Sequence, residues 1–182
     1  MIRQNFCAKS DDRREQILGR LVDHVLAHGL SASSLRPLAK AARISDRMLL
    51  YYFKDKAEII AATLDEVSMR LVTRLSALTA STPLPLATLR GNLQTVVLAD
   101  EMWPYMRLWV EVASLAAYGD PLLRQVGERI ARGFLAWGAA QLDSPTPEQR
   151  LADAAALLVM IEGMILLKSV GLEDVCRAAS NR

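Results

Sequence analysis

Apolar residues recur at intervals of three and four along most of the chain, which is the spacing of amphipathic α-helices. Short stretches that contain proline interrupt this pattern at residues 81–85, 118–121 and 143–147. We therefore expect an all-α protein. The pattern predicts helices over residues 11–28, 34–42, 46–53, 56 to the break near 81, 86–99, 105–117, 121–142 and 147–170, with a short final helix from Glu173.

The most informative stretch is residues 33–60, where two short helices flank a tight turn. Ser33 and Ser45 are the expected caps of these two helices. Leu49 and Phe53, four residues apart, mark the buried side of the second helix. Two such helices, the second presenting hydrogen-bonding side chains, follow the helix-turn-helix plan that reads a DNA major groove. The side facing away from the core carries Asp46, Arg47, Leu50 and Tyr51.

The longer helix that follows begins with a capping pattern. Asp55 and Glu58, three residues apart, form a variant of the capping box, and the helix then runs from Lys56 to the break near residue 81. This helix is long enough to connect a head to a body. We expect a head over residues 1–55, whose first ten residues form a loose arm, and a larger helical domain over residues 56–182.

Charge is distributed unevenly, although the formal net charge is only +2. Residues 1–60 hold 11 Lys and Arg against seven Asp and Glu, whereas the remainder carries a net negative charge. A modestly basic amino-terminal third fits contact with phosphates. Ordinary solvated helices also produce such an asymmetry.

Several kinds of site are not expected. Cys7 and Cys176 stand far apart and form no paired motif, and His24 and His28 have metal-ligand spacing without a recognisable third ligand. The sequence shows no nucleophile–base pair or phosphate loop, so we expect no catalytic residues, no cofactor and no metal. The first residues lack an apolar segment, and the apolar run over residues 154–167 is interrupted by Glu162. We expect a cytoplasmic protein that is not an enzyme and has no membrane partner.

Residues 13–60 resemble the DNA-binding domain of the tetracycline-repressor (TetR) family. The likeness is carried by the first helix and by the segments LRPLAKAARIS and LLYYFKDKAEII. The second segment contains Tyr52-Phe53-x-x-Lys56, followed by an acidic residue and two aliphatic residues. The helical remainder, which ends in two long helices, is similar in architecture to the family's ligand-binding and dimerisation domain. The resemblance implies a three-helix helix-turn-helix head on a larger helical domain.

Carried to this chain, the family pattern implies a set of DNA contacts. Backbone phosphates would be held by Ser34, Arg36, Tyr52 and Lys56. Base edges would face Asp46, Arg47, Leu50 and Tyr51, with Arg47 able to pair with a guanine and Leu50 able to pack on a thymine methyl. The turn residues Arg43 and Ser45 complete the expected interface. The core of the head would consist of Leu38, Ala39, Ala42, Leu49 and Phe53.

Three positions depart from the family pattern. Arg43 stands where the family usually has glycine, and a left-handed conformation there costs a non-glycine residue roughly 1–2 kcal/mol. Met48 replaces a small hydroxyl residue and Leu50 replaces a frequent tyrosine. These changes leave the fold intact but make the operator sequence unpredictable.

A single recognition helix offers few base contacts, so specific binding calls for two heads on a palindromic site. The resemblance implies a homodimer in which the last two long helices form an antiparallel four-helix interface. The expected interface residues are Phe134, Leu135, Trp137, Leu158, Glu162 and Leu166. The alternative is that these residues complete the core of the monomer.

Methionine and aromatic residues gather between residues 102 and 118, in a chain that is only 5% aromatic. Such a lining suits a small apolar effector, whereas the same spacing also suits plain core. The expected ligand-binding residues are Met102, Trp103, Tyr105, Met106, Trp109 and Tyr118. The resemblance thus implies a dimeric repressor that a small apolar ligand releases from double-stranded DNA. The alternative is a regulator of the same fold without an inducer, acting as an activator or with a protein partner.

Overall fold

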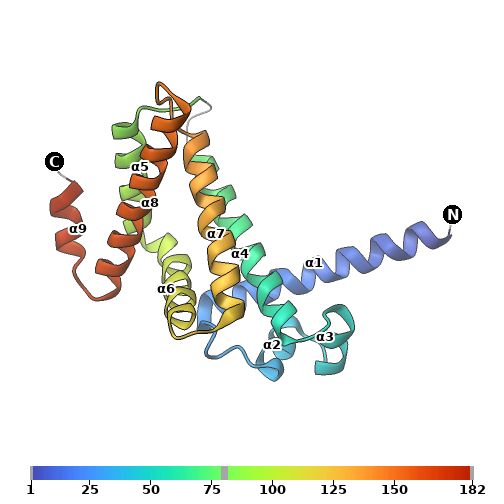
Figure 1. Cartoon of the computed structure of the whole chain (residues 1–182). Coiled ribbons are helices and arrows are strands. Elements are labelled where there is room, and N and C mark those ends of the chain that lie inside the picture. Colours follow the sequence, from blue (N-terminus) through green and yellow to red (C-terminus); the bar gives the residue numbers. More distant parts are fainter. Residues whose placement is uncertain (1, 79–81, 181–182) are drawn as a thin grey trace. The chain divides into compact units, whose positions relative to one another are not determined.

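The computed structural model describes the backbone of residues 2–78 and 82–180, and side chains over residues 12–76 and 82–179. Apart from an isolated bridge between Leu84 and Leu142, the regular structure over these residues is helical, as the sequence predicts (Figure 1). The chain divides into two compact units, one ending at Met69 and the other beginning at Arg70. Helix α4, Lys56–Leu78, begins in the first unit and ends in the second.

The first unit contains three helices before α4. They are α1 (Ile2–His28), α2 (Leu35–Ala42) and α3 (Asp46–Tyr52). The loose arm expected over residues 1–10 is wrong for the residues described, because α1 begins at Ile2. Residues 2–10 contain neither glycine nor proline to interrupt the helix. As predicted, α1 ends before Gly29, whose φ of 80° is left-handed.

The α1–α2 connection differs in detail from the prediction. Ser34, not Ser33, is the N-cap of α2, and its side chain makes no capping hydrogen bond. Ser33 is instead fully buried, and its hydroxyl donates a 2.7 Å hydrogen bond to the carbonyl of Gly29. The expected core of the head is confirmed. Five side chains there are at most 1% exposed: Leu38, Ala39, Ala42, Leu49 and Phe53.

The second unit consists of the end of α4 and the helices that follow. They are α5 (Leu86–Leu98), the short 3₁₀ helix η1 (Asp100–Met102), α6 (Trp103–Ala117), α7 (Pro121–Ala140), α8 (Pro147–Ser169) and α9 (Glu173–Ser180). Helix α8 packs against α5, α6, α7 and α9, and in Figure 1 it runs between α5 and α7. Helix α8 is therefore the central element of this unit.

Prolines begin helices in this unit. Pro121 and Pro147 open α7 and α8 behind the caps Asp120 and Thr146, whose side chains accept hydrogen bonds from Leu123 and Gln149 amides. The predicted break between residues 99 and 105 is present as Ala99 and η1, but α6 begins at Trp103, two residues earlier than expected. Pro104 lies in its first turn, where a missing N–H leaves no hydrogen bond unmade.

No helix in the described part of the chain is both long enough and apolar enough to cross a membrane.

Candidate nucleic-acid interface

One face of α3 is free for contacts. Leu49 is fully buried and fixes the opposite side of the helix against the core, whereas Tyr51 is 74% and Leu50 42% exposed. Asp46 and Arg47 are exposed as well. Positions i, i+1, i+4 and i+5 share one side of a helix, so these four side chains point outward together. The arrangement matches the prediction and leaves a polar, partly aromatic surface one helix wide.

The turn before α3 holds this face in a fixed orientation. The Ser45 hydroxyl accepts a 3.2 Å hydrogen bond from the Met48 amide, which confirms the predicted cap. Arg43 has φ 58° and ψ 43°, the left-handed conformation that its family position implied. The guanidinium of Arg20 on α1 donates a 2.8 Å hydrogen bond to the Ala42 carbonyl at the end of α2. Helix α1 therefore braces the turn from behind.

The junction between α3 and α4 is equally well tied. The Glu58 amide donates to Asp55 Oδ1 at 2.9 Å, and the Lys54 amide donates to Glu58 Oε2 at 2.7 Å. This confirms a variant capping box. The Arg14 guanidinium lies 4.7 Å over the Phe53 ring and 3.5 Å from Glu58 Oε1. Lys56, exposed in the first turn of α4, is thus held at a helix N-terminus that favours anions.

The residues expected to hold phosphate lie at the ends of helices. Ser34 and Arg36 are exposed at the start of α2. Tyr52 is half-buried, with its ring edge-on to that of Tyr51 at 5.3 Å. The other predicted DNA-binding residues all lie at the surface of this unit: Arg43, Ser45, Asp46, Arg47, Leu50, Tyr51 and Lys56. The bracing residues Arg14 and Arg20 were missed, because a basic side chain on an amphipathic helix has the same pattern whether it is solvated or braces a neighbour.

Most of the Met/aromatic group expected to bind a ligand lies together on η1 and α6 of the second unit. Met102, Tyr105 and Met106 are at most 6% exposed, and Trp103 and Trp109 are half-buried. Tyr118 does not belong to the group, since it is 90% exposed. The expectation for Tyr118 is wrong because α6 ends at Ala117, and the chain turns at Gly119 with φ 97°.

Two cations flank the aromatic rings of this group. The Arg74 guanidinium lies 5.5 Å from the centroid of Tyr105, and Lys168 Nζ lies 5.1 Å from that of Trp103. The Lys168 side chain is only 8% exposed and donates a 2.6 Å hydrogen bond to the Leu98 carbonyl at the end of α5. The sequence does not predict the contacts of Arg74 and Lys168, because the residues in contact are far apart in the chain and share no local pattern.

Glu162 joins α8 to α6. Its Oε2 accepts a 2.7 Å hydrogen bond from the indole N–H of Trp109, and burial raises the pKa of this carboxyl group. The sequence placed Glu162 on the dimer surface. The structure instead turns the carboxylate toward α6, so the pair brings together one residue expected to bind ligand and one expected at the dimer interface.

The remaining residues expected at the dimer interface are unequally exposed. Leu166 on α8 is 59% exposed, whereas four others are half-buried: Phe134, Leu135, Trp137 and Leu158. Further apolar side chains on α8 and beyond it are exposed by 42% to 72%: Leu151, Val159, Val170, Leu172 and Val175. Apolar surface is therefore richer on α8 and its C-terminal continuation than on α7.

A three-helix head with one exposed, rigidly held helix face defines a helix-turn-helix DNA-binding protein. The model of the bacterial regulatory proteins of the tetR family matches residues 25–63. The HTH-type transcriptional regulator BetI of Burkholderia mallei is 28% identical over 163 residues, which cover 85% of this chain and 80% of BetI.

Solved structures agree with this match. The multidrug binding protein EbrR, solved with ethidium, is 26% identical, with a TM-score of 0.68 over 93% of this chain and 97% of EbrR. EbrR has also been solved with proflavin. A transcriptional regulator from Rhodococcus sp. Rha1 has the same fold, with a TM-score of 0.70 at 22% identity over 92% of this chain and 91% of its own. Residues 25–63 therefore match the tetR family of bacterial regulatory proteins, and the proteins that resemble this chain over most of its length include transcriptional regulators rather than enzymes.

Proposed function

We propose that this protein is a homodimeric repressor that binds a palindromic operator and is released from it by a small apolar molecule. The observation that carries the proposal is the exposed face of α3, held between a capped turn and a braced α4. In this proposal residues 1–55 bind DNA, and residues 56–182 bind the ligand and form the dimer. The protein would act in the cytoplasm, where its operator lies.

Base readout in this proposal comes from α3. Arg47 pairs with a guanine and Leu50 packs on a thymine methyl, while Asp46 and Tyr51 face neighbouring base edges. The phosphates are held by Ser34, Arg36, Tyr52 and Lys56, and Arg43 adds a cation beside the duplex. The exposure of these side chains and the rigidity of the two junctions support the assignment.

We place the dimer surface along α8. Val159 and Leu166 are 72% and 59% exposed although both are apolar, and Gly163 lies on the same helix between them. A Cβ added at Gly163 would meet no atom of this chain within 4 Å. Glycine inside a helix lowers stability by roughly 0.5–1 kcal/mol relative to alanine. Close approach by a second copy of the chain would explain why glycine occupies this position. The half-buried residues of α7 would lie at the margin of the interface.

The dimer is tested by a matched pair of substitutions. Leu166→Glu puts a charge on the proposed interface, and Leu115→Glu puts the same charge on an exposed position of α6, where Leu115 is 37% exposed. Sedimentation velocity is expected to show a monomer for Leu166→Glu and a dimer for Leu115→Glu. Two dimers would contradict the α8 interface, and a wild-type monomer would contradict the dimer altogether.

We place the ligand against the Met/aromatic group of η1 and α6. Adaptable methionine and aromatic side chains suit an apolar, aromatic molecule, and EbrR, a relative of this fold, has been solved with ethidium and with proflavin. Glu162, half-buried beside Trp109, adds a carboxylate that would favour a ligand with positive charge. In the proposal the ligand binds one conformation of the dimer better than the operator-bound one, and this difference in affinity drives release.

The most direct experiment is a gel shift against the DNA that flanks the protein's own gene. Wild type is expected to shift a palindromic fragment, and Arg47→Ala and Tyr51→Ala are expected not to. If no palindrome there binds specifically and both variants behave like wild type, the assignment of the interface fails.

The effector is tested on the same complex. A ligand found by its effect on melting temperature should release the DNA from wild type but not from Trp109→Ala, with Tyr118→Ala as the control because its ring is 90% exposed. If ligands that bind leave the complex intact, the regulator has no inducer of this kind. A reporter gene then distinguishes a repressor from an activator.

A further inference from the structure

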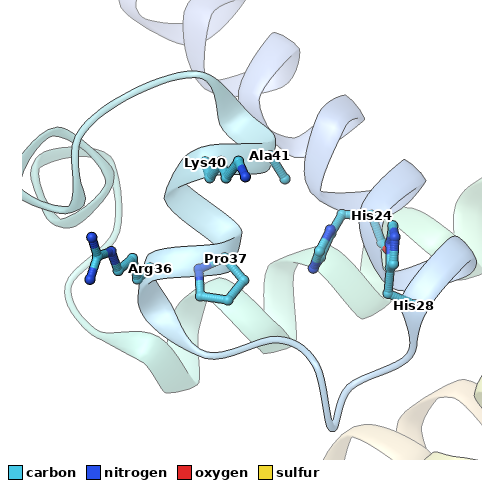
Figure 2. Close-up of a pocket in the computed structure, with 6 residues that line it drawn as sticks. All are labelled: His24, His28, Arg36, Pro37, Lys40 and Ala41. Atoms are coloured by element: carbon cyan, nitrogen blue, oxygen red, sulfur yellow. The ribbon is translucent and has the colours of Figure 1, made fainter.

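A hollow of about 590 Å³ lies between α1 and α2, within the first unit. Figure 2 shows that its side chains come from two helices: His24 and His28 from α1, and Arg36, Pro37, Lys40 and Ala41 from α2. Of these six residues, only Arg36 belongs to the proposed operator contacts. The hollow is therefore a feature that base readout by α3 does not use.

The chemistry of the hollow favours an anion. Arg36 and Lys40, one turn apart on α2, carry positive charge, and His24 and His28, one turn apart on α1, line the opposite wall. Burial and the neighbouring His28 lower the pKa of His24, so the positive charge of the hollow comes from α2. None of the six lining residues is acidic. Pro37 and Ala41 contribute apolar surface, so the polar groups that line the hollow are all cations or imidazoles.

The start of α2 strengthens this preference. The N-cap Ser34 makes no side-chain hydrogen bond to the first turn of α2, although Pro37 has no N–H to offer and leaves the Leu35 and Arg36 amides as the donors of that turn. A helix N-terminus left uncapped in this way attracts negative charge through its free amides and the helix dipole. Arg36 lies in that first turn and also lines the hollow.

The two imidazoles are held in one arrangement. Their rings stack with centroids 4.6 Å apart and an interplanar angle of 25°. His28 Nδ1 donates a 3.0 Å hydrogen bond to the His24 carbonyl, which can only accept. Nε2 is therefore the ring nitrogen of His28 left for a ligand: it accepts from a phosphate O–H in the neutral ring and donates to a phosphate oxygen only in the imidazolium form. His24 Nε2 is buried and has no hydrogen-bond partner within the described residues. This wall thus offers a ligand the Nε2 atom of His28, whereas His24 Nε2 is enclosed by protein atoms.

We propose that this hollow is a phosphate-binding site, in which Arg36 and Lys40 of α2 hold the anion and His28 and His24 of α1 close the other side. The phosphate could belong to the operator backbone or to a free phosphorylated molecule. Both have the same chemistry, and the two sources give different results in the experiment below. The inference goes beyond the proposed operator contacts, because Lys40, His24 and His28 are not among them.

The chain contains only two histidines, and both line the hollow, so their NMR signals report on this site alone. The full-length protein, labelled in histidine, is titrated with inorganic phosphate at constant ionic strength, with chloride as the reference. Saturable shifts of both imidazole signals in phosphate, but not in chloride, are the expected result. His28→Gln assigns the two signals.

A matched pair of variants locates the binding. Lys40→Met removes one charge from the hollow, and Arg13→Met removes one charge from half-buried Arg13 of α1, which does not line the hollow. Lys40→Met should weaken phosphate binding about tenfold, the size of one charge-assisted hydrogen bond, and Lys40→Arg should restore most of it. Arg13→Met should match wild type. Both variants are checked by circular dichroism for an unchanged helix content.

The source of the phosphate is read from the salt dependence of DNA affinity. If the site holds a backbone phosphate, Lys40→Met lowers the slope of log Kd against log salt by about 1 relative to Arg13→Met. If inorganic phosphate binds but the slopes agree, the ligand is a free phosphorylated molecule. If Lys40→Met lowers the slope of log Kd against log salt but inorganic phosphate does not bind, the site binds phosphate only as part of the DNA backbone.

The proposal is overturned if phosphate and chloride shift the histidine signals equally and the slopes of Lys40→Met and Arg13→Met coincide. Failure of the wild type to bind any operator would count against the proposed function but not against this site, because the phosphate titration needs no DNA.

Discussion

The two compact units use their exposed apolar surface differently. In the head, apolar side chains are exposed on α3, where Met48, Leu50 and Tyr51 lie on or beside the face proposed to enter the major groove. In the second unit Leu115 and Tyr118 are exposed at the end of α6, and the other exposed apolar side chains follow α8 into the turn and α9: Leu151, Val159, Leu166, Val170, Leu172 and Val175. Residue type alone does not tell these two surfaces apart.

The difference lies in what accompanies the apolar side chains. On α3 they lie beside Asp46 and Arg47. The junctions on both sides are tied by backbone amides that donate hydrogen bonds to the side chains of Ser45, Asp55 and Glu58. On α8 they stand beside alanines and Gly163, whose missing side chains leave the backbone open to close approach. Charged groups beside apolar ones suit a hydrated polyanion, whereas small residues suit a second helix.

The strongest test of the comparison asks whether the head unfolds on its own. Leu49 is fully buried and its neighbour Leu50 is 42% exposed, so the same substitution can be made at both. Leu49→Ala should destabilise the head by about 2–5 kcal/mol, because it removes buried methyl groups and leaves a cavity. Leu50→Ala should change stability by only about 0.5 kcal/mol.

The three tryptophans provide a probe that distinguishes the units, because all of them lie after residue 100. Leu49→Ala is expected to give a transition at lower temperature in circular dichroism that leaves tryptophan fluorescence unchanged. If both signals move together, the two units unfold cooperatively and the comparison between them loses its thermodynamic basis.

Much of the head follows from its sequence, because its determinants are local. The Ser45 cap, the Asp55–Glu58 capping pattern and the four-residue spacing of Leu49 and Phe53 each involve neighbours in the chain, and the structure bears them out. The start of α1 and the cap of α2 were less predictable. Two adjacent serines offer equal caps, and the burial of Ser33 depends on the path of the whole loop.

The second unit was less predictable because its contacts are distant in sequence. The spacing of apolar residues predicts where the helices lie in the sequence. It does not predict which face of each helix packs against which other helix. Glu162 reaches Trp109 and Lys168 reaches the Leu98 carbonyl, pairs separated by 53 and 70 positions. Tyr118 was grouped with the other aromatic residues because it is near them in sequence. Its 90% exposure follows from where α6 stops.

A second test separates base readout from phosphate contact within the head. Arg47→Ala should weaken binding to the operator by about 1–3 kcal/mol and affect an unrelated duplex far less, since a base contact is lost. Lys56→Ala should weaken binding to both duplexes similarly and lower the salt slope by about 1. Fluorescence anisotropy at several salt concentrations measures both effects. Equal losses on both duplexes for Arg47→Ala would remove it from the base-reading set.

A third test concerns strain in the turn. Arg43 is the one non-glycine residue with positive φ among those described, and glycine adopts this conformation without steric cost. Arg43→Gly should therefore raise the stability of the head by about 1 kcal/mol. It should also weaken DNA binding slightly, because a cation beside the duplex is lost.

Lys40→Gly, at an exposed position inside α2, is the control for the glycine itself and should lower stability by roughly 0.5–1 kcal/mol. Urea unfolding followed by circular dichroism distinguishes the two. A loss of stability in Arg43→Gly would mean that Arg43 makes a contribution in the folded turn that outweighs its backbone strain.

The smallest expected effect is on stability at pH 8, where substitutions of Glu162 and Glu148, two glutamates of α8, should change stability in opposite directions. Burial raises the pKa of Glu162, so the folded protein disfavours its ionised form. The contribution of this group to stability is complete below the ordinary glutamate pKa and is lost as the pH rises through the raised value. Glu162→Gln keeps an acceptor for the Trp109 N–H but carries no charge. The variant should therefore be more stable than wild type at pH 8, by about 1 kcal/mol or less, and equal to it near pH 4.

Glu148, in the first turn of the same helix, supplies the opposite case. Its pKa is lowered by hydrogen bonds from its own backbone amide and from Thr146, so its ionised form is favoured in the folded protein. The contribution of Glu148 to folding stability is present above the ordinary glutamate pKa and is lost as the pH falls through the lowered pKa. Glu148→Gln should therefore destabilise the protein at pH 8. Urea titrations of both variants at pH 4 and pH 8 measure the two signs. If both substitutions shift stability in the same direction at pH 8, the change reflects the net charge of α8. The Glu162 carboxylate beside Trp109 would then not be the buried, ligand-selecting group proposed for the second unit.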